Sequence, residues 1–205
     1  MSARRQRDRV AGFTIIELVV TILVAAILTA IAVPQFQATL QRYRQRSAVA
    51  DLQASLQYAR TESVLRATYV SLCASADGAT CSGTTTYETG WLVYVHPVAT
   101  TSATDTYTAS AASGMQILRV ATALNQVSVR ALDGSVVTFG QQGQLEPVAS
   151  RTNASQPMAF VVCAVTGGTA TLGSNTSRVP GSRLAVSRFG AVAASRLDGT
   201  GTCLP

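Results

Sequence analysis

The stretch RVAGFTIIELVVTILVAAILTAIAVPQF, residues 9–36, decides the fold of this 205-residue chain. From Phe13 to Val33 the only charged residue is Glu17, which gives an apolar run of 21 residues. A helix of that length spans about 30 Å, the thickness of the hydrocarbon core of a bilayer. A carboxylate in such a segment costs at least about 2–3 kcal/mol unless it has a partner. The stretch therefore predicts a membrane-spanning helix in which the Glu17 carboxylate interacts with a partner group.

The helical pattern continues beyond Pro34, although a proline normally kinks or interrupts a helix. Apolar residues recur there at spacings of three and four, at Val49, Leu52, Leu56 and Ala59. This period is typical of an amphipathic helix. We therefore expect one long, bent helix over residues 14–66, with a transmembrane half at 13–34 and an amphipathic half at 35–66.

After residue 66 the sequence changes to short runs rich in β-branched and aromatic residues, separated by Gly, Ser, Thr, Asp and Pro. The expected strands are residues 68–73, 90–95, 115–121, 127–132, 135–139, 159–165 and 183–187. Asp133–Gly134 predicts a tight hairpin between two of them, and residues 100–113 and 166–182 have the composition of exposed loops. The fold class is therefore α+β, with a long N-terminal α-helix packed on a mostly antiparallel β-sheet in a globular domain over residues 67–205.

The composition fits a membrane-tethered or exported protein, because 47% of the residues are hydrophobic and only 13% are charged. The net charge is +6, and four of the 16 basic residues, all of them Arg, lie in the first twelve positions. Without those positions the chain has 12 basic and 9 acidic residues. The basic N-terminal segment favours a cytoplasmic N-terminus, although Arg42, Arg44 and Arg46 reduce the asymmetry across the helix.

Four widely spaced cysteines in a chain that leaves the cytosol predict two disulfides. Three connectivities are possible. We favour Cys73–Cys81, which closes a local loop, together with Cys163–Cys203, which ties down the C-terminal tail. No pair of cysteines has the C-x-x-C spacing, and the chain has one histidine, so we expect no metal site.

Catalytic signatures are absent from the sequence. His96 is the only histidine, and a surface or core role suits it better than that of a general base. No nucleophile elbow occurs, and GQQGQ at 140–144 is too short for a phosphate loop. The large apolar residues of the expected strands indicate a sheet face packed on the helix: Trp91, Leu92, Tyr94, Phe139 and Phe160. We expect no catalytic residue, no cofactor and no enzyme.

Residues 1–34 resemble the class III signal of type IV pilins and type II secretion pseudopilins. The resemblance rests on the basic leader, Gly12 directly before Phe13, Glu17 five residues into the mature chain, and Pro34. It implies a prepilin leader peptide at residues 1–12, cleavage between Gly12 and Phe13 by prepilin peptidase, and N-methylation of Phe13. It also implies a single-pass inner-membrane precursor whose C-terminal domain lies in the periplasm.

The remainder resembles the GspH/FimT-type branch of this superfamily. The resemblance is carried by LQASLQYARTESVLRATYVSLC (52–73), GWLVYV (90–95), VTFGQQGQL (137–145), FVVC (160–163) and RLAVSRFG (183–190). It implies a pilin-like fold and a minor pilin that joins other minor and major pilins, at the filament tip, to prime pilus assembly, with roles in adhesion, twitching motility or DNA uptake. The alternative is an H-type minor pseudopilin of a type II secretion system.

Within this resemblance Glu17 gains an expected partner. Cleavage creates a positively charged amine at Phe13, and a carboxylate on a neighbouring subunit's helix can neutralise it. The low dielectric of a packed helical core strengthens such a pair and makes either charge costly alone. We therefore expect Glu17 and Pro34 to act in assembly.

DNA is a further candidate partner, because some members of this branch bind it through a Gly-Arg-x-Arg type motif near the C-terminus. That motif is absent here, since Ala191 and Val192 follow Gly190. Arg178, Arg183, Arg188 and Arg196 nevertheless cluster near the end of the sequence and could contact phosphates. Scattered, solvated arginines are the alternative interpretation.

Overall fold

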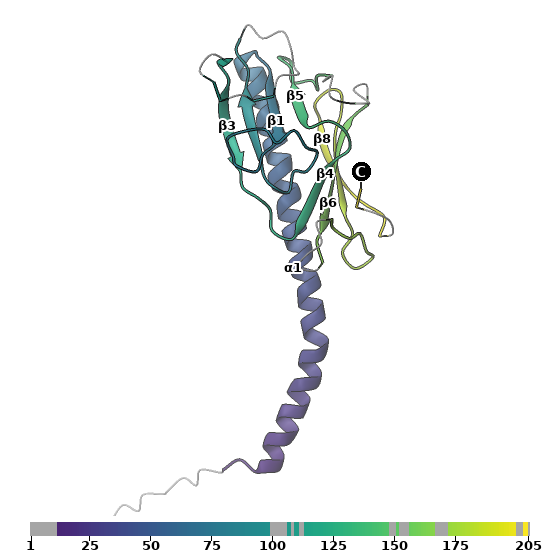
Figure 1. The fold of residues 1–205 in the computed structure, drawn as a ribbon. Helices are drawn as coiled ribbons and strands as arrows, with labels where there is room; N and C mark the ends of the chain where they lie inside the picture. Colours follow the sequence, from purple (N-terminus) through teal and green to yellow (C-terminus); the bar gives the residue numbers. More distant parts are fainter. Residues whose placement is uncertain are drawn as a thin grey trace, which may run out of the picture. The chain divides into compact units, whose positions relative to one another are not determined.

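The computed structural model describes residues 12–98, 106–107, 109–110, 113–147, 151, 156–166, 172–199 and 203–204. The chain forms two compact units, Met1–Thr39 and Leu40–Pro205. The first unit contains the N-terminal part of the helix α1, and the second contains the rest of α1 together with the strands β1–β8 (Figure 1).

The helix α1 (Ile15–Arg66) runs through Pro34 without a break, so the helix expected over residues 14–66 is confirmed. Its C-terminus is closed by two backbone hydrogen bonds, from Ala67 to the carbonyl of Val64 and from Thr68 to the carbonyl of Ser63. Ala67 has a φ of 48°. A left-handed residue with these two bonds forms a Schellman motif, which satisfies carbonyls at the helix end and turns the chain toward the first strand.

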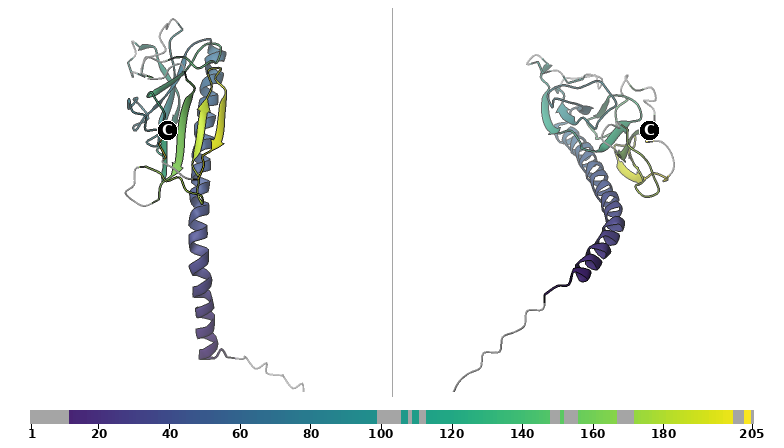
Figure 2. Two further views of the ribbon diagram at one scale, coloured as in Figure 1. Left: turned by 90° about the vertical axis from the view of Figure 1, so that its right-hand side faces the viewer. Right: turned by 60° about the horizontal axis from the view of Figure 1, so that its bottom comes forward.

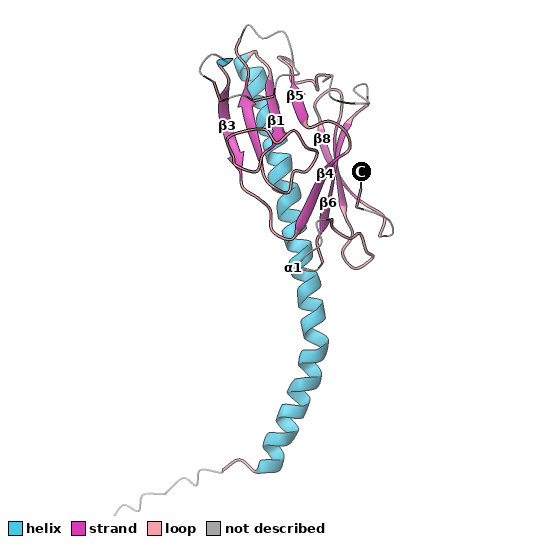
Figure 3. Cartoon of the chain, in the orientation of Figure 1, coloured by secondary structure: helices cyan, strands magenta, loops and turns pink. Residues whose placement is uncertain are grey.

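The strands form two four-stranded sheets, where the sequence analysis expected one (Figure 3). Their orders are β3–β2–β1–β5 and β4–β6–β7–β8, and all neighbours pair antiparallel. The bounds are β1 (Val70–Ala74), β2 (Trp91–Val95), β3 (Gln116–Ala121), β4 (Val127–Ala131), β5 (Val136–Phe139), β6 (Met158–Ala164), β7 (Ser182–Val186) and β8 (Val192–Arg196). The first seven match the expected strands to within two residues. β8 was not expected, because its sequence VAASR is short, mixed and mostly exposed.

The hairpin expected at Asp133–Gly134 is wrong. These residues follow β4 and precede β5, but the two strands belong to different sheets. The Asp133 carboxylate is buried and accepts a hydrogen bond from Nε of Arg151 at 3.1 Å. Gly134 has a φ of 75°, and a Cβ there would lie 2.5 Å from Cγ of Arg151. Gly134 therefore lies where the chain crosses from one sheet to the other, packed against Arg151, and it is not part of a two-residue turn.

Of the two expected exposed loops, most of residues 100–113 and part of 166–182 lie outside the described residues. The described part of the second loop differs from the expectation. Gly173, Val179 and Gly181 are buried in it.

The main core lies between the second half of α1 and both sheets. It contains Leu52, Leu56 and Ala59 of α1 with Trp91, Phe139 and Phe160 of the strands. Both views in Figure 2 show this part of α1 lying along the strands. Leu92 and Tyr94 differ from the expected arrangement, because they pack in a second cluster with Cys73 and Val136. Since strand side chains alternate between faces, β2 is buried on both sides.

Two disulfides join Cys73 to Cys81 and Cys163 to Cys203, the pairs that the sequence favoured. The first closes the segment after β1, with a sequence separation of 8. The second attaches the C-terminal segment to β6 across a separation of 40. Cys203 packs there with Val161 and Leu197. The second disulfide therefore covers the face of β6 that is turned away from the main core.

Arg60 connects α1 to a loop from each sheet. Its Nε donates a hydrogen bond to the carbonyl of Gly143 at 3.0 Å, and its Nη2 donates to the carbonyl of Phe189 at 3.0 Å. The backbone N–H of Leu145 also donates to the carbonyl of Arg188 at 2.9 Å. These contacts hold the loop after β5 against the β7–β8 turn.

Candidate functional site

The helix α1 begins at Ile15, two residues after Phe13, which is the expected first residue of the processed chain. Residues 1–11 of the expected leader lie outside the described residues. Gly12, Phe13 and Thr14 precede the helix, and the N–H of Glu17 donates to Oγ1 of Thr14 at 3.3 Å. Thr14 is thus the N-cap, and it fixes where the helix starts. The peptide bond between Gly12 and Phe13 therefore lies in non-helical, exposed chain.

Gly12 has no role in the described structure that would require a glycine. A Cβ built on it meets no heavy atom within 4 Å, and its φ lies outside the left-handed region. Neither packing nor backbone conformation among the described residues therefore accounts for a glycine at this position.

The helix surface from Phe13 to Val33 is apolar and exposed. Phe13 is 78% exposed and Ile15 is 84% exposed. An 18-residue window of α1 has a mean hydropathy of 2.7, so the helix is long and apolar enough to cross a membrane. The hydroxyls of Thr21 and Thr29 donate to carbonyls of the preceding turn, which satisfies these groups inside the helix. The segment is therefore suited to lipid or to the apolar surface of other helices.

Glu17 stands alone on this apolar surface. It lies in the first turn of α1, where the helix dipole favours a carboxylate. Within the part of the chain that the structure describes, no basic side chain pairs with it. A partner for Glu17 must therefore come from another molecule or from the leader end of the chain.

Pro34 lies inside α1 and has no N–H to donate to the carbonyl of Ala30. The helix continues across this missing bond. The turn around Pro34 therefore lacks one backbone hydrogen bond of α1.

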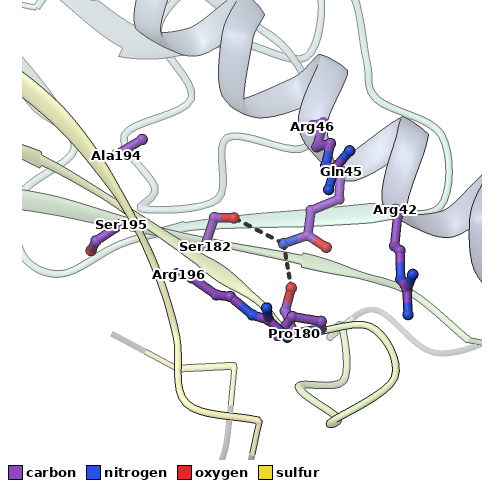
Figure 4. Close-up of a pocket in the computed structure, with 8 residues that line it drawn as sticks. All are labelled: Arg42, Gln45, Arg46, Pro180, Ser182, Ala194, Ser195 and Arg196. Carbon is purple, nitrogen blue, oxygen red and sulfur yellow. Dashed lines mark hydrogen bonds between the residues drawn. The ribbon is translucent and has the colours of Figure 1, made fainter.

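A second feature is a basic pocket between α1 and sheet β4–β6–β7–β8, with a volume of about 430 Å³. Arg42, Gln45 and Arg46 of α1 line one side, and Arg196 of β8 lines the other (Figure 4). Gln45 is buried, and its Nε2 donates to the carbonyl of Pro180 at 2.9 Å and to Oγ of Ser182 at 3.1 Å. Among the described residues, no acidic side chain lines the pocket.

The four arginines proposed as DNA contacts do not form one patch. Arg196 lies in the basic pocket, whereas Arg183 is exposed on β7 beside Ser182, on the other face of the strand. Arg178 precedes β7, and its carbonyl accepts a hydrogen bond from Nε of Arg42 at 2.8 Å. Arg188 follows β7, at the opposite end of the strand from Arg178. The sequence showed the cluster near the C-terminus but gave no sign that Arg196 would join Arg42 and Arg46.

His96 is buried in a polar network, in agreement with a core role. Its Nε2 lies 2.8 Å from Oγ of Ser71, and that hydroxyl lies 2.7 Å from Oγ1 of Thr138. Ser71 and Thr138 have no exposed surface. The contact resembles a nucleophile and its base, but a substrate cannot reach the serine in this structure.

Comparison with known families identifies the chain. A family model described as type II transport protein GspH matches residues 48–187, more than half of the chain. The chain belongs to the GspH family. A second model, described as a prokaryotic N-terminal methylation motif, matches residues 7–33 and contains Gly12, Phe13 and Glu17. No curated protein matches in sequence.

One solved structure supports the fold. The type IV minor pilin FimU of Pseudomonas aeruginosa (strain PAO1), in space group P21, is 19% identical, with 79% of this chain and 96% of that chain covered and a TM-score of 0.50. A second FimU structure, in space group P65, is 19% identical, with 77% and 98% covered and a TM-score of 0.47. This chain thus has the fold of a minor type IV pilin, which confirms the pilin-like fold that the sequence predicted. Members of the family are membrane-anchored structural subunits that assemble with other pilins.

Proposed function

We propose that this GspH-family protein is a minor type IV pilin, processed by prepilin peptidase between Gly12 and Phe13 and N-methylated on Phe13. The observation that carries the proposal is Gly12 itself. It lies in exposed, non-helical chain directly before the capped start of α1, and no contact or backbone angle requires a glycine there. A peptidase that admits only a hydrogen at this position accounts for it.

After processing, Glu17 pairs with the Phe13 amine of a neighbouring subunit. The exposed apolar surface of residues 13–33 packs against other helices in the filament core, and the mature domain leaves the periplasmic side of the inner membrane as the subunit joins the filament. In that core an isolated carboxylate or amine is costly, so the pair favours one stagger between subunits. The protein acts near the filament tip, where it primes assembly and supports adhesion, twitching motility or DNA uptake.

Processing is tested by producing the full chain with and without prepilin peptidase and measuring its intact mass. We expect the peptidase to remove residues 1–12 and the product to carry one methyl group on Phe13. Gly12→Ala should leave the precursor intact. Processing at another bond, or an unmodified mass in both strains, would overturn the proposal.

Assembly is tested with Glu17→Ala in sheared filaments. We expect this variant to be processed but depleted from filaments at least tenfold, because the neighbour's amine is left without a counter-charge. Asp51→Ala, which removes an exposed carboxylate from the amphipathic half of α1, is the matched control and should be incorporated normally. Equal incorporation of both variants would disprove the pair.

The alternative is an H-type minor pseudopilin of a type II secretion system, which the description of the matching family favours. Deletion of the gene separates the two machines. Loss of surface pili with normal exoprotein secretion supports the minor pilin, and the opposite result supports the pseudopilin.

A further inference from the structure

We propose that the basic pocket between α1 and β8 binds an acidic side chain of a partner subunit. The proposal rests on the function proposed above, because it assumes that the protein assembles with other pilins. The pocket, defined by Arg42, Gln45, Arg46, Pro180, Ser182 and Arg196, is here called the arginine pocket.

Among the residues that the structure describes, no carboxylate compensates the charge of the arginine pocket. Arg42 and Arg46 of α1 and Arg196 of β8 line it from two elements. The ion pairs among the described residues lie elsewhere, at Glu62–Arg66, Glu88–Arg130 and Asp133–Arg151. A concave site lined by one sign of charge concentrates its field on a ligand of the opposite sign.

The walls of the pocket are held in place before any ligand arrives. Arg42 donates through Nε and Nη2 to the carbonyl of Arg178, which directs its guanidinium along the pocket. Gln45, which is 3% exposed, joins α1 to Pro180, Ser182 and, at 3.2 Å, the carbonyl of Val162. Figure 4 shows the hydrogen bonds of Gln45 with Pro180 and Ser182. Because the walls are already ordered, binding a ligand orders only the side chains of Arg46 and Arg196.

The shape and chemistry of the pocket favour a carboxylate. The planar guanidinium group matches a carboxylate with two parallel hydrogen bonds, and Arg46 and Arg196 make no hydrogen bond with the described residues that would compete. A volume of about 430 Å³ admits one or two side chains. A nucleic acid strand needs contacts along an extended track. Of the other basic residues near the C-terminus, Arg178 lies next to Arg42, but Arg183 lies on the other strand face and Arg188 at the far end of β7.

The position of the pocket on α1 also favours a subunit as the partner. Arg42 follows Pro34 by eight residues, so it lies just beyond the apolar segment through which subunits would pack. A neighbour bound through that segment brings its own chain close to this part of the helix. An acidic residue of that neighbour would then fix its domain in one orientation.

The test is site-specific photocrosslinking in the native host. The full-length chain carries p-benzoylphenylalanine at Ala194, which is exposed and lines the pocket on the strand face opposite to Arg183. Crosslinked peptides are then sequenced from the membrane and filament fractions. We expect a crosslink to another pilin subunit, or to a second copy of this chain, at a peptide that contains Asp or Glu.

Matched variants test whether the crosslink depends on the positive charge of the arginine pocket. Arg46→Glu with Arg196→Glu should reduce the crosslink yield at least tenfold, whereas Arg183→Glu, a charge reversal on the other face of β7, should leave it unchanged. Replacing the acidic residue found in the partner by Arg should restore the crosslink of the double variant.

Several results would overturn the proposal. These are a crosslink to phospholipid or nucleic acid, a crosslink to a pilin peptide without acidic residues, full yield in the double variant, or no crosslink in either fraction. Leader removal and filament content are read in the same cells. A processed and incorporated chain without the acidic crosslink refutes the arginine pocket alone, whereas an unprocessed chain refutes the proposed function.

Discussion

The backbone carbonyl of Gly143 occupies the space in which a side chain at position 190 would begin. The two glycines belong to VTFGQQGQL and RLAVSRFG, two of the passages on which the family resemblance rests. Gly190 also has a φ of 76°, in the left-handed region. The contact brings the loop after β5 against the β7–β8 turn, next to Arg60. It is therefore one of the places where the two sheets and α1 are held together.

Gly190→Ala should destabilise the protein by roughly 2–4 kcal/mol, because left-handed strain adds to a clash with backbone that cannot move aside easily. The measurement is thermal unfolding of the full chain in detergent, followed by the circular dichroism of the strands. Gly83→Ala is the control, since Gly83 has a φ of 68° but nothing within 4 Å of its Cβ position. It should cost only about 1 kcal/mol. Equal losses would show that the close approach is unimportant.

Arg60→Ala should cost about 1.5–3 kcal/mol, because the charged group bonds two loop carbonyls and is partly buried. The comparison is Arg66→Ala on the same helix, where the side chain is 45% exposed and pairs with Glu62 one turn away. Such a surface pair contributes only about 0.3–0.5 kcal/mol. The two losses are measured by denaturant titration. If Arg60→Ala costs no more than Arg66→Ala, the loops are held by other contacts.

The helix and most strands could be predicted from the sequence because their signals are local. The apolar run from Phe13 to Val33 and the spacing of Leu52 and Leu56 specify a helix, and β-branched runs specify strands. β8 carries no such signal. Its VAASR sequence becomes a strand because β7 offers a free edge, with Ser182 opposite Arg196. That information lies in the tertiary structure.

The sequence could not predict which sheet each strand joins, nor the arginine pocket, because both depend on tertiary contacts. Asp133–Gly134 has the composition of a tight turn, but its neighbours choose different sheets, and the partner of Asp133 is Arg151, which lies beyond β5. Arg42 and Arg196 lie far apart in the sequence. Only the packing of β8 beside α1 brings them together. The local sequence pattern determines the helix and the strands, whereas the long-range packing of these elements determines which charged side chains come into contact.

The Asp133–Arg151 pair is buried, with side-chain exposures of 7% and 1%. Arg151→Met should therefore cost about 3–5 kcal/mol, because a carboxylate is left in the interior without its counter-charge. The double variant Asp133→Leu with Arg151→Met should lose less than the sum of the two single variants, since no buried charge remains. A double-mutant cycle by chemical denaturation measures this coupling. Additive losses would mean that the pair is solvated and contributes little.

Removing the Cys163–Cys203 disulfide should destabilise the protein more than removing Cys73–Cys81. Loop-closure entropy grows with the number of residues enclosed, and the separations are 40 and 8. The chain-entropy relation gives roughly 4 kcal/mol for the longer loop and roughly 2.5 kcal/mol for the shorter one. Two double variants test this, Cys163→Ala with Cys203→Ala and Cys73→Ala with Cys81→Ala, compared by thermal unfolding of the full chain in detergent. The first should also expose the face of β6 that Cys203 covers, which faster hydrogen exchange at Val161 would detect. The reverse order of stability would show that packing around Cys73, rather than loop length, determines how much each disulfide stabilises the protein.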